Sequence, residues 1–263
     1  MKVGISHLIL PELPLEIFFK QSAAAGYEVV ELVLKREGEL TLKSSDSDLK
    51  RIAELSKQYN LPIASICLSH CTGNLLESGV LQRASIDETV AGLHLAKKLG
   101  VGCTLHTLGR LNKDLFYDDA YRNAVASLKE ISRTAQEVDV SLAVEFVWNG
   151  FLFSPLEMKR FLDEIQSPKI GFYFDPGNMA VFQYPQHWAR ILGSHLKMVH
   201  MKDWKGNALN GSWPALLKGN CDYTAINAEL RRAGYDGPMI SEVELKEASL
   251  EESAQSIRMI INM

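Results

Sequence analysis

Residues 171–204 read GFYFDPGNMAVFQYPQHWARILGSHLKMVHMKDW, and this stretch decides the expected fold. Two apolar runs typical of buried strands end in it on residues that can bind a metal ion, Asp175 and His200. A Pro-Gly-Asn turn and a segment of helical composition separate the two runs. A buried strand that ends on an ionisable residue places that residue at the edge of a sheet, where loops build functional sites. We therefore expect other strands to bring matching ligands to the same edge.

The same alternation of apolar runs and helical patterns extends over the whole chain. Candidate strands span residues 3–9, 28–34, 63–68, 103–107, 142–147, 170–174, 196–201 and 239–243. They are short and almost continuously apolar, as are parallel strands that are buried on both faces. Gly26, Gly100 and Gly234 each follow a helical pattern, at the place where a left-handed residue commonly ends a helix.

Eight strands in alternation with eight helical segments favour an α/β fold, a closed (β/α)8 TIM barrel that takes in residues 1–263 as a single domain. An open doubly wound sheet is the alternative, because a count of strands does not show closure. Neither a G-x-G-x-x-G motif after the first strand nor a G-x-x-x-x-G-K-[ST] motif occurs, so the nucleotide-binding fingerprints that would favour the open sheet are missing.

The composition is that of an ordinary globular protein. Of the 263 residues, 46% are apolar and 23% are charged, and the formal net charge of −4 provides no basic field for nucleic acid. Four cysteines form no C-x-x-C pair, which predicts reduced thiols in a cytoplasmic protein. The first residues fit neither a signal peptide nor a membrane helix, so we expect no membrane association.

An ionisable side chain stands at or near the end of every predicted strand. In chain order these residues are His7, Glu31, His70, His106, Glu145, Asp175, His200 and Glu242. A buried carboxylate is costly unless it is paired or bound to a cation, so random packing would not place such groups at nearly every strand end. The pattern predicts a polar site at the carboxyl-terminal mouth of the barrel.

Glu145, Asp175, His200 and Glu242 form the sharpest candidate metal site. Three carboxylates and one imidazole suit a single divalent ion, Mn²⁺ first, with Mg²⁺, Co²⁺ and Zn²⁺ as alternatives, and leave positions for substrate oxygens. The alternative is that each residue forms a separate ion pair with a Lys or Arg at the barrel mouth.

Other residues are candidates for contact with a substrate. His70 and His106 are expected either to bind substrate or to be hydrogen-bonded in the core, and His7 and Glu31 to support the ligands or to face the substrate. Trp148, with Phe151, would form an apolar wall or belong to the aromatic core, and Lys202 would contact substrate or pair with Asp203. His94, His187 and His195 are interpreted as structural.

At this point the residues resemble the xylose isomerase-like TIM barrels, which include ketose 3-epimerases, hydroxypyruvate isomerase, inosose dehydratase and endonuclease IV. The matching segments are AVEF (143–146), FDPGN (174–178), VHMKD (199–203) and GYDGPMISEVE (234–244). The resemblance implies that Glu145, Asp175, His200 and Glu242 bind one divalent metal ion. Glu244 is a neighbouring rival that alternation would place one pleat farther out, so Glu242 is preferred.

The chain also departs from the ketose 3-epimerases of that family. Phe151 stands where they carry an acidic substrate-binding residue, Asn178 where they carry a His, and Gly206 where they carry an Arg. Asn178 is expected to take a substrate-side place in the altered site. The contacts with sugar hydroxyls should therefore differ from those of the usual ketose epimerases, and the lyase and isomerase branches remain open.

The chemistry of the family implies an isomerase or epimerase of a sugar or polyol ketone. A metal ion that chelates a carbonyl and the adjacent hydroxyl acidifies the neighbouring C–H and stabilises an enediolate. Glu145 and Glu242 are expected to be both ligands and acid–base groups. Alternatives are a dehydratase, in which His106 or His70 protonates the leaving hydroxyl, an endonuclease IV-like nuclease, and a non-catalytic sugar-binding barrel. The loop that holds Trp213 is interpreted as a lid or a dimer contact, so a homodimer is left open.

Overall fold

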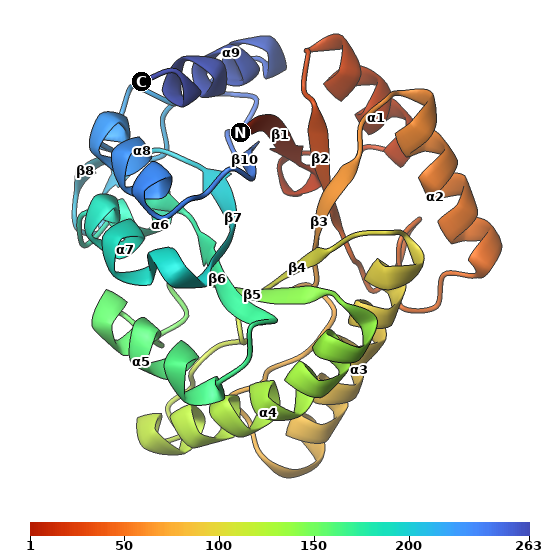
Figure 1. The fold of residues 1–263 in the computed structure, drawn as a ribbon, viewed down its shortest axis with the longest axis vertical. Helices are drawn as coiled ribbons and strands as arrows, with labels where there is room; N and C mark the ends of the chain where they lie inside the picture. Colours follow the sequence, from red (N-terminus) through yellow and green to blue (C-terminus); the bar gives the residue numbers. More distant parts are fainter.

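The protein is a closed barrel of eight parallel strands surrounded by helices (Figure 1), and the computed structural model describes all residues 1–263. The barrel strands are β1 (Lys2–Ser6), β2 (Val29–Val33), β3 (Ile63–Cys67), β4 (Cys103–His106), β5 (Ser141–Glu145), β6 (Ile170–Phe174), β7 (Leu196–Met201) and β10 (Pro238–Ser241). Strand β1 pairs with both β2 and β10, which closes the sheet. The predicted TIM barrel is therefore confirmed, and the open sheet is excluded.

The helices form the outer layer of the barrel. They are α1 (Leu15–Ala24), α2 (Asp46–Gln58), α3 (Gly79–Lys98), α4 (Tyr117–Val138), α5 (Pro155–Ile165), α6 (Pro176–Ala180), α7 (Pro185–Leu192), α8 (Tyr223–Arg232) and α9 (Leu250–Ile261). A small antiparallel hairpin, β8 (Lys205–Asn207) and β9 (Asn210–Ser212), follows β7. None of the helices has the length and apolar character that crossing a membrane requires. All four cysteines are free, as expected.

Six of the predicted strands end later than the observed ones, β1 by three residues, β5 and β10 by two, and β2, β3 and β4 by one. Strand β1 ends at Ser6, because the Ser6 hydroxyl accepts a hydrogen bond from the backbone N–H of Leu8 at 3.1 Å and the chain turns into a short 3₁₀ helix over His7–Ile9. Strand β5 ends at Glu145, two residues before the predicted end at 147. In both cases the apolar run continues into the loop that follows the strand, which is why composition alone placed the ends too late.

The interior of the barrel explains how the strands position the candidate site. Eight buried apolar residues pack inside it: Val33, Cys67, Cys103, Leu105, Ala143, Tyr173, Met198 and Ile240. Side chains alternate across a strand, so the residue two positions later points to the same face. Two positions after Ala143, Tyr173, Met198 and Ile240 stand Glu145, Asp175, His200 and Glu242. The four predicted ligands therefore continue the inward-facing rows of four neighbouring strands.

Three glycines end helices in the predicted way. Gly26, Gly100 and Gly234 follow α1, α3 and α8 with φ of +82°, +71° and +74°. A side chain is disfavoured in this left-handed region because its Cβ approaches the carbonyl oxygen. Each glycine lets the chain reverse from a helix toward the next strand.

Replacement of Gly100 by Ala is expected to lower the free energy of unfolding by about 1 kcal/mol, because Ala is disfavoured at positive φ. A Cβ at this position would meet no atom within 4 Å, so the loss comes from the backbone alone. Gly102 is the matched control, since a Cβ there also meets no atom within 4 Å and its φ lies outside the positive range. Urea denaturation followed by circular dichroism measures both variants, and equal midpoints would contradict this account.

Candidate metal centre

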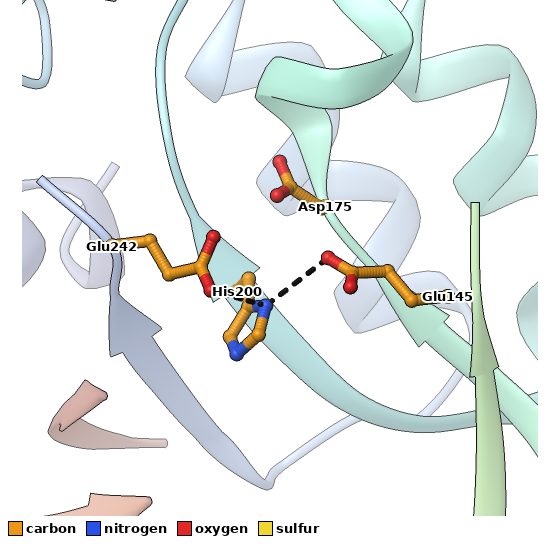
Figure 2. A group of neighbouring side chains, drawn as sticks. All are labelled: Glu145, Asp175, His200 and Glu242. Atoms are coloured by element: carbon orange, nitrogen blue, oxygen red, sulfur yellow. Dashed lines mark hydrogen bonds and ion pairs between the residues drawn. The ribbon is translucent and has the colours of Figure 1, made fainter. Parts of the chain in front are cut away.

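The structure brings the four predicted metal ligands together at the mouth of the barrel. Glu145 ends β5, Asp175 follows β6, His200 lies in β7 and Glu242 follows β10. One potential ligand atom from each residue lies within 4.8 Å of those of the other three. Figure 2 shows Glu145 and Glu242 reaching His200 from opposite sides, with Asp175 beside them. The neighbouring Glu244 is exposed and pairs with Lys246.

Hydrogen bonds and ion pairs connect the group. The His200 Nδ1 atom lies 3.2 Å from Glu145 Oε1 and 3.4 Å from Glu242 Oε1. The Lys202 ammonium lies 3.2 Å from Asp175 Oδ2 and also pairs with Glu242. Lys202 therefore does not pair with Asp203. The Asp203 carboxylate instead accepts backbone hydrogen bonds from Trp204, Gly219 and Cys221, which fixes the loop after β7.

Burial and the neighbouring charges shift the pKa values of the side chains in this group. Burial raises the pKa of Glu145 to about 7, against the opposing effect of the hydrogen bond from His200. Burial alone would lower the pKa of His200, but the carboxylates of Glu242 and Glu31 raise it well above its usual value. Burial would likewise raise the pKa of Glu242, but the charges of His200 and Lys202 lower it. His200 and Lys202 thus provide the positive charge that neutralises the carboxylates of Glu145, Asp175 and Glu242, whose side chains have almost no access to water.

The donor set fits a divalent cation. The Asp175 Oδ2 atom is buried and has no hydrogen-bond partner, with the Lys202 ammonium as its neighbouring charge. A buried carboxylate oxygen without a hydrogen bond is costly, and a divalent cation would stabilise it beyond what the Lys202 ammonium provides. Carboxylate oxygens with one imidazole nitrogen are ligands suited to hard and borderline divalent ions. The buried residues present are therefore compatible with such an ion.

A second buried layer lies under the ligands. Glu31, on β2, is fully buried and accepts hydrogen bonds from Ser6, Ser65 and Tyr173. Its other contact is His200 Nε2, at 2.9 Å. Glu31 was a predicted supporting residue, but Tyr173, Ser6 and Ser65 were missed by the sequence analysis. Strand alternation held the signal for Tyr173, which stands two residues before Asp175 and so faces the interior.

Asn178, Trp148 and Lys202, three of the predicted substrate contacts, lie at the same mouth. The Asn178 side-chain amide donates to Glu145 Oε1 at 3.3 Å, and the Trp148 indole N–H donates to the Asn178 carbonyl at 3.0 Å. Trp148 stacks on Trp213 with ring centroids 5.1 Å apart, and the Lys202 ammonium lies 5.4 Å from the Trp213 ring centroid. These aromatic rings form one wall beside the carboxylates.

A cavity opens next to this wall. Its volume is about 480 Å³, and it is lined by Leu8, Ile9, Lys202, Glu242, Glu244, Leu245 and Lys246. A smaller cavity of about 180 Å³ shares Lys202, Glu242 and Glu244 and extends to Trp213. A ligand in these cavities would contact Glu242 and Lys202 together.

His7 and His106 lie outside the ligand group, and His106 has the hydrogen-bonded core position that was one of its two expected roles. His7 packs on Phe18 of α1, with ring centroids 4.7 Å apart, because Ser6 takes the inward position on β1. His106 follows the inward-facing Leu105 and is fully buried, with both ring nitrogens hydrogen-bonded, to Thr72 and to the Leu108 N–H. Burial lowers the pKa of His106 to about 4.

The structure also places the remaining candidates. His70 lies in an exposed turn after β3, outside the ligand group, and its contact with substrate stays a prediction. Phe151 is buried and packs against Tyr117 and Phe161, so it belongs to the aromatic core.

Comparison with known proteins assigns the fold family. The family described as xylose isomerase-like TIM barrel matches residues 19–262. The chain belongs to this family. No match was found among curated proteins.

Several solved structures share this xylose isomerase-like barrel. A D-tagatose 3-epimerase-like protein superposes with a TM-score of 0.84 at 20% identity, over 100% of this chain and 98% of that protein. D-psicose 3-epimerase from Clostridium cellulolyticum H10, solved with D-tagatose, gives 0.83 at 14% identity and 99% of both chains. The IOLI protein with a bound zinc atom gives 0.81 at 16% identity, over 99% and 96%. At these identities the similarity establishes the fold.

The affinity of this xylose isomerase-like barrel for Mn²⁺ is expected to rise with pH. Because the pKa of His200 is raised, its ring carries both protons near neutral pH, and an ion has to displace the proton on Nδ1. The affinity should therefore increase about tenfold per pH unit above about pH 7, and more steeply below it, where Glu145 with its pKa of about 7 also has to lose a proton. Calorimetric titrations at several pH values, in buffers of different ionisation enthalpy, measure the affinity and the released proton. A constant affinity without proton release would contradict the prediction.

Proposed function

We propose that this protein is a divalent-metal-dependent isomerase or epimerase of a sugar or polyol ketone. The observation that carries the proposal is the placement of Glu145 and Glu242 on opposite sides of His200, with Glu242 lining a cavity. The fold shared with D-psicose and D-tagatose 3-epimerases supports a sugar substrate, and the zinc atom in the IOLI protein supports a metal ion in this type of barrel. A cytoplasmic location and a homodimer remain predictions.

Glu145, Asp175, His200 and Glu242 would hold the ion, Mn²⁺ first. When bound, it would supply a Lewis acid for the carbonyl and adjacent hydroxyl oxygens of the substrate. Asp175 and His200 are fully buried, whereas the side chains of Glu145 and Glu242 keep 6% and 8% of their surface exposed. Glu242 lines both cavities at the mouth, so its carboxylate is placed to reach substrate, and Glu145 would act from the opposite side of His200 (Figure 2).

The two glutamates provide a path for the proton. One carboxylate takes the proton from the carbon next to the carbonyl, the C–H electron pair becomes the C=C bond of an enediolate, and the carbonyl π pair moves onto oxygen. The other carboxylate returns a proton on the opposite face, which inverts the carbon and gives an epimer. Return of the proton to the neighbouring carbon on the same face gives a 1,2-isomer.

Lys202, Asn178 and Trp148 would complete the substrate site. Lys202 borders both cavities at the mouth, so its ammonium is placed to meet a negatively charged substrate oxygen. Asn178 holds Glu145 through its side-chain amide. Trp148 and Trp213 offer flat apolar surfaces to the non-reacting face of the substrate.

The alternative functions have less support. For dehydration a second acid is needed. His106 has no free ring nitrogen to serve as one, and His70 lies in an exposed turn outside the ligand group. A nuclease like endonuclease IV is disfavoured by the net charge of −4. A non-catalytic sugar-binding barrel differs from an enzyme in one measurable respect, which is exchange of a substrate C–H proton with solvent.

Replacement of Glu145 or Glu242 by Gln is expected to abolish the exchange of substrate C–H protons with deuterated water. Each variant keeps the size of the side chain but loses the base, and the expected loss is at least about a hundredfold. Proton NMR with added Mn²⁺ and a panel of ketoses, inososes and hydroxypyruvate measures the exchange. Glu137→Gln is the control, because Glu137 is exposed on α4 and lies outside both the ligand group and the cavities at the mouth. Full activity in either glutamate variant would reject its acid–base role.

Replacement of Lys202 by Met is expected to lower kcat about a hundredfold, as the loss of one stabilising donor does in other enzymes. Affinity for Mn²⁺ should not fall, because the variant removes a cation that contacts Asp175 and Glu242. Lys246→Met is the control, since Lys246 lines the same cavity but pairs with Glu244. Unchanged kcat in the Lys202 variant would show that its ammonium does not meet the reacting oxygen.

A further inference from the structure

Glu31 is a buried carboxylate that the proposed reaction does not use. It accepts four side-chain contacts, from Ser6 at 2.7 Å, Ser65 at 2.6 Å, Tyr173 at 2.6 Å and His200 at 2.9 Å. The four partners come from β1, β3, β6 and β7, so the network joins both halves of the barrel. Three of the partners are hydroxyl groups, and the fourth is the imidazole of the candidate metal ligand.

The contact between Glu31 and His200 determines which ring nitrogen faces the other ligands. The Nε2 atom of His200 points to Glu31 Oε1, and Nδ1 points to Glu145 and Glu242. A carboxylate only accepts hydrogen bonds, so Nε2 has to keep its proton. Nδ1 is then the nitrogen that can lose its proton and offer a lone pair to an ion.

The ring has little freedom to turn away from this arrangement. His200 is fully buried, and Tyr173 lies against it with ring centroids 4.4 Å apart. The Tyr173 hydroxyl donates to Glu31 Oε2, while His200 contacts Oε1 of the same carboxylate. One carboxylate therefore fixes both the aromatic neighbour of the ring and the ring itself.

We propose that Glu31 is a positioning residue for the candidate metal centre. By holding the proton on Nε2 of His200, Glu31 presents Nδ1 of the same ring to the ion. This inference rests on the proposed function in requiring that the site binds a divalent ion. It adds to the four ligands a fifth acidic residue that acts through His200. Glu31 also makes the imidazole a better donor, because a carboxylate at the far nitrogen increases the basicity of the near one.

The test is the affinity for Mn²⁺ of Glu31→Gln, measured by isothermal titration calorimetry. The Gln amide is neutral and close in size to the carboxylate, and the surrounding hydroxyls can turn to accept hydrogen bonds from it. The expected loss of affinity is about tenfold to about a hundredfold, as for other residues that orient metal ligands. Circular dichroism checks that the variant is folded. An affinity equal to that of the unmodified protein overturns the proposal.

Tyr173→Phe is the matched control. It removes one hydrogen bond from Glu31 but leaves the carboxylate and its contact with His200 in place. We expect its affinity for Mn²⁺ to change less than threefold. A loss equal to that of Glu31→Gln would mean that packing of the network, and not the contact of the Glu31 carboxylate with His200 Nε2, supports the ion. That result overturns the positioning role. Absence of Mn²⁺ binding by the unmodified protein overturns the metal site itself, so the two failures are distinguishable.

A measurement on the unmodified protein decides the matter if Glu31→Gln does not fold. Histidine labelled with ¹⁵N allows the two ring nitrogens of His200 to be distinguished by their couplings to the ring protons. In the Zn²⁺-loaded protein, Nε2 of His200 should carry the proton and Nδ1 should be bound to the metal. A proton on Nδ1 in the loaded protein would overturn the proposal.

Discussion

Three carboxylates are buried around one imidazole, and the electrostatic cost of bringing their negative charges together is the constraint on which the rest of this site depends. Glu145, Asp175 and Glu242 lie close together in a place with almost no access to water, where like charges are costly without compensation. His200 and Lys202 provide compensating charge. Asp175 Oδ2 accepts no hydrogen bond besides its ion pair with Lys202, and a divalent cation would add to the compensation.

The barrel makes such a cluster tolerable because it holds each ligand on a rigid strand end. Apolar residues fill the interior, and the ligands come two positions farther along the same inward rows. Below His200 the hydroxyls of Ser6, Ser65 and Tyr173 surround Glu31, so its charge is also satisfied within the protein. The inner end of the polar site is therefore fully hydrogen-bonded within the protein. A ligand can reach the site only from the mouth, where Glu242 and Lys202 border the cavities.

Asn178 and an aromatic pair stand beside the four clustered side chains. The Asn178 amide donates to Glu145 Oε1, so this residue affects the position of a candidate ligand. Phe151 lies in the aromatic core, whereas Trp148 and Trp213 stack on one another at the mouth. The wall beside the carboxylates is therefore apolar and aromatic.

The sequence by itself determined the barrel and the grouping of Glu145, Asp175, His200 and Glu242, because buried parallel strands have a recognisable composition and each of these side chains lies on the inward side where its strand ends. It also favoured Glu242 over Glu244, which the structure places outside the cluster. Only the tertiary structure decided that Lys202 pairs with Asp175 and Glu242, that Glu31 meets Tyr173 142 residues away, and that His7 and His106 face outward. These contacts depend on how far neighbouring strands are shifted along one another, and on whether the last residue of each strand faces into or out of the barrel. If a strand end is misplaced by one residue, the predicted direction of its side chain is reversed.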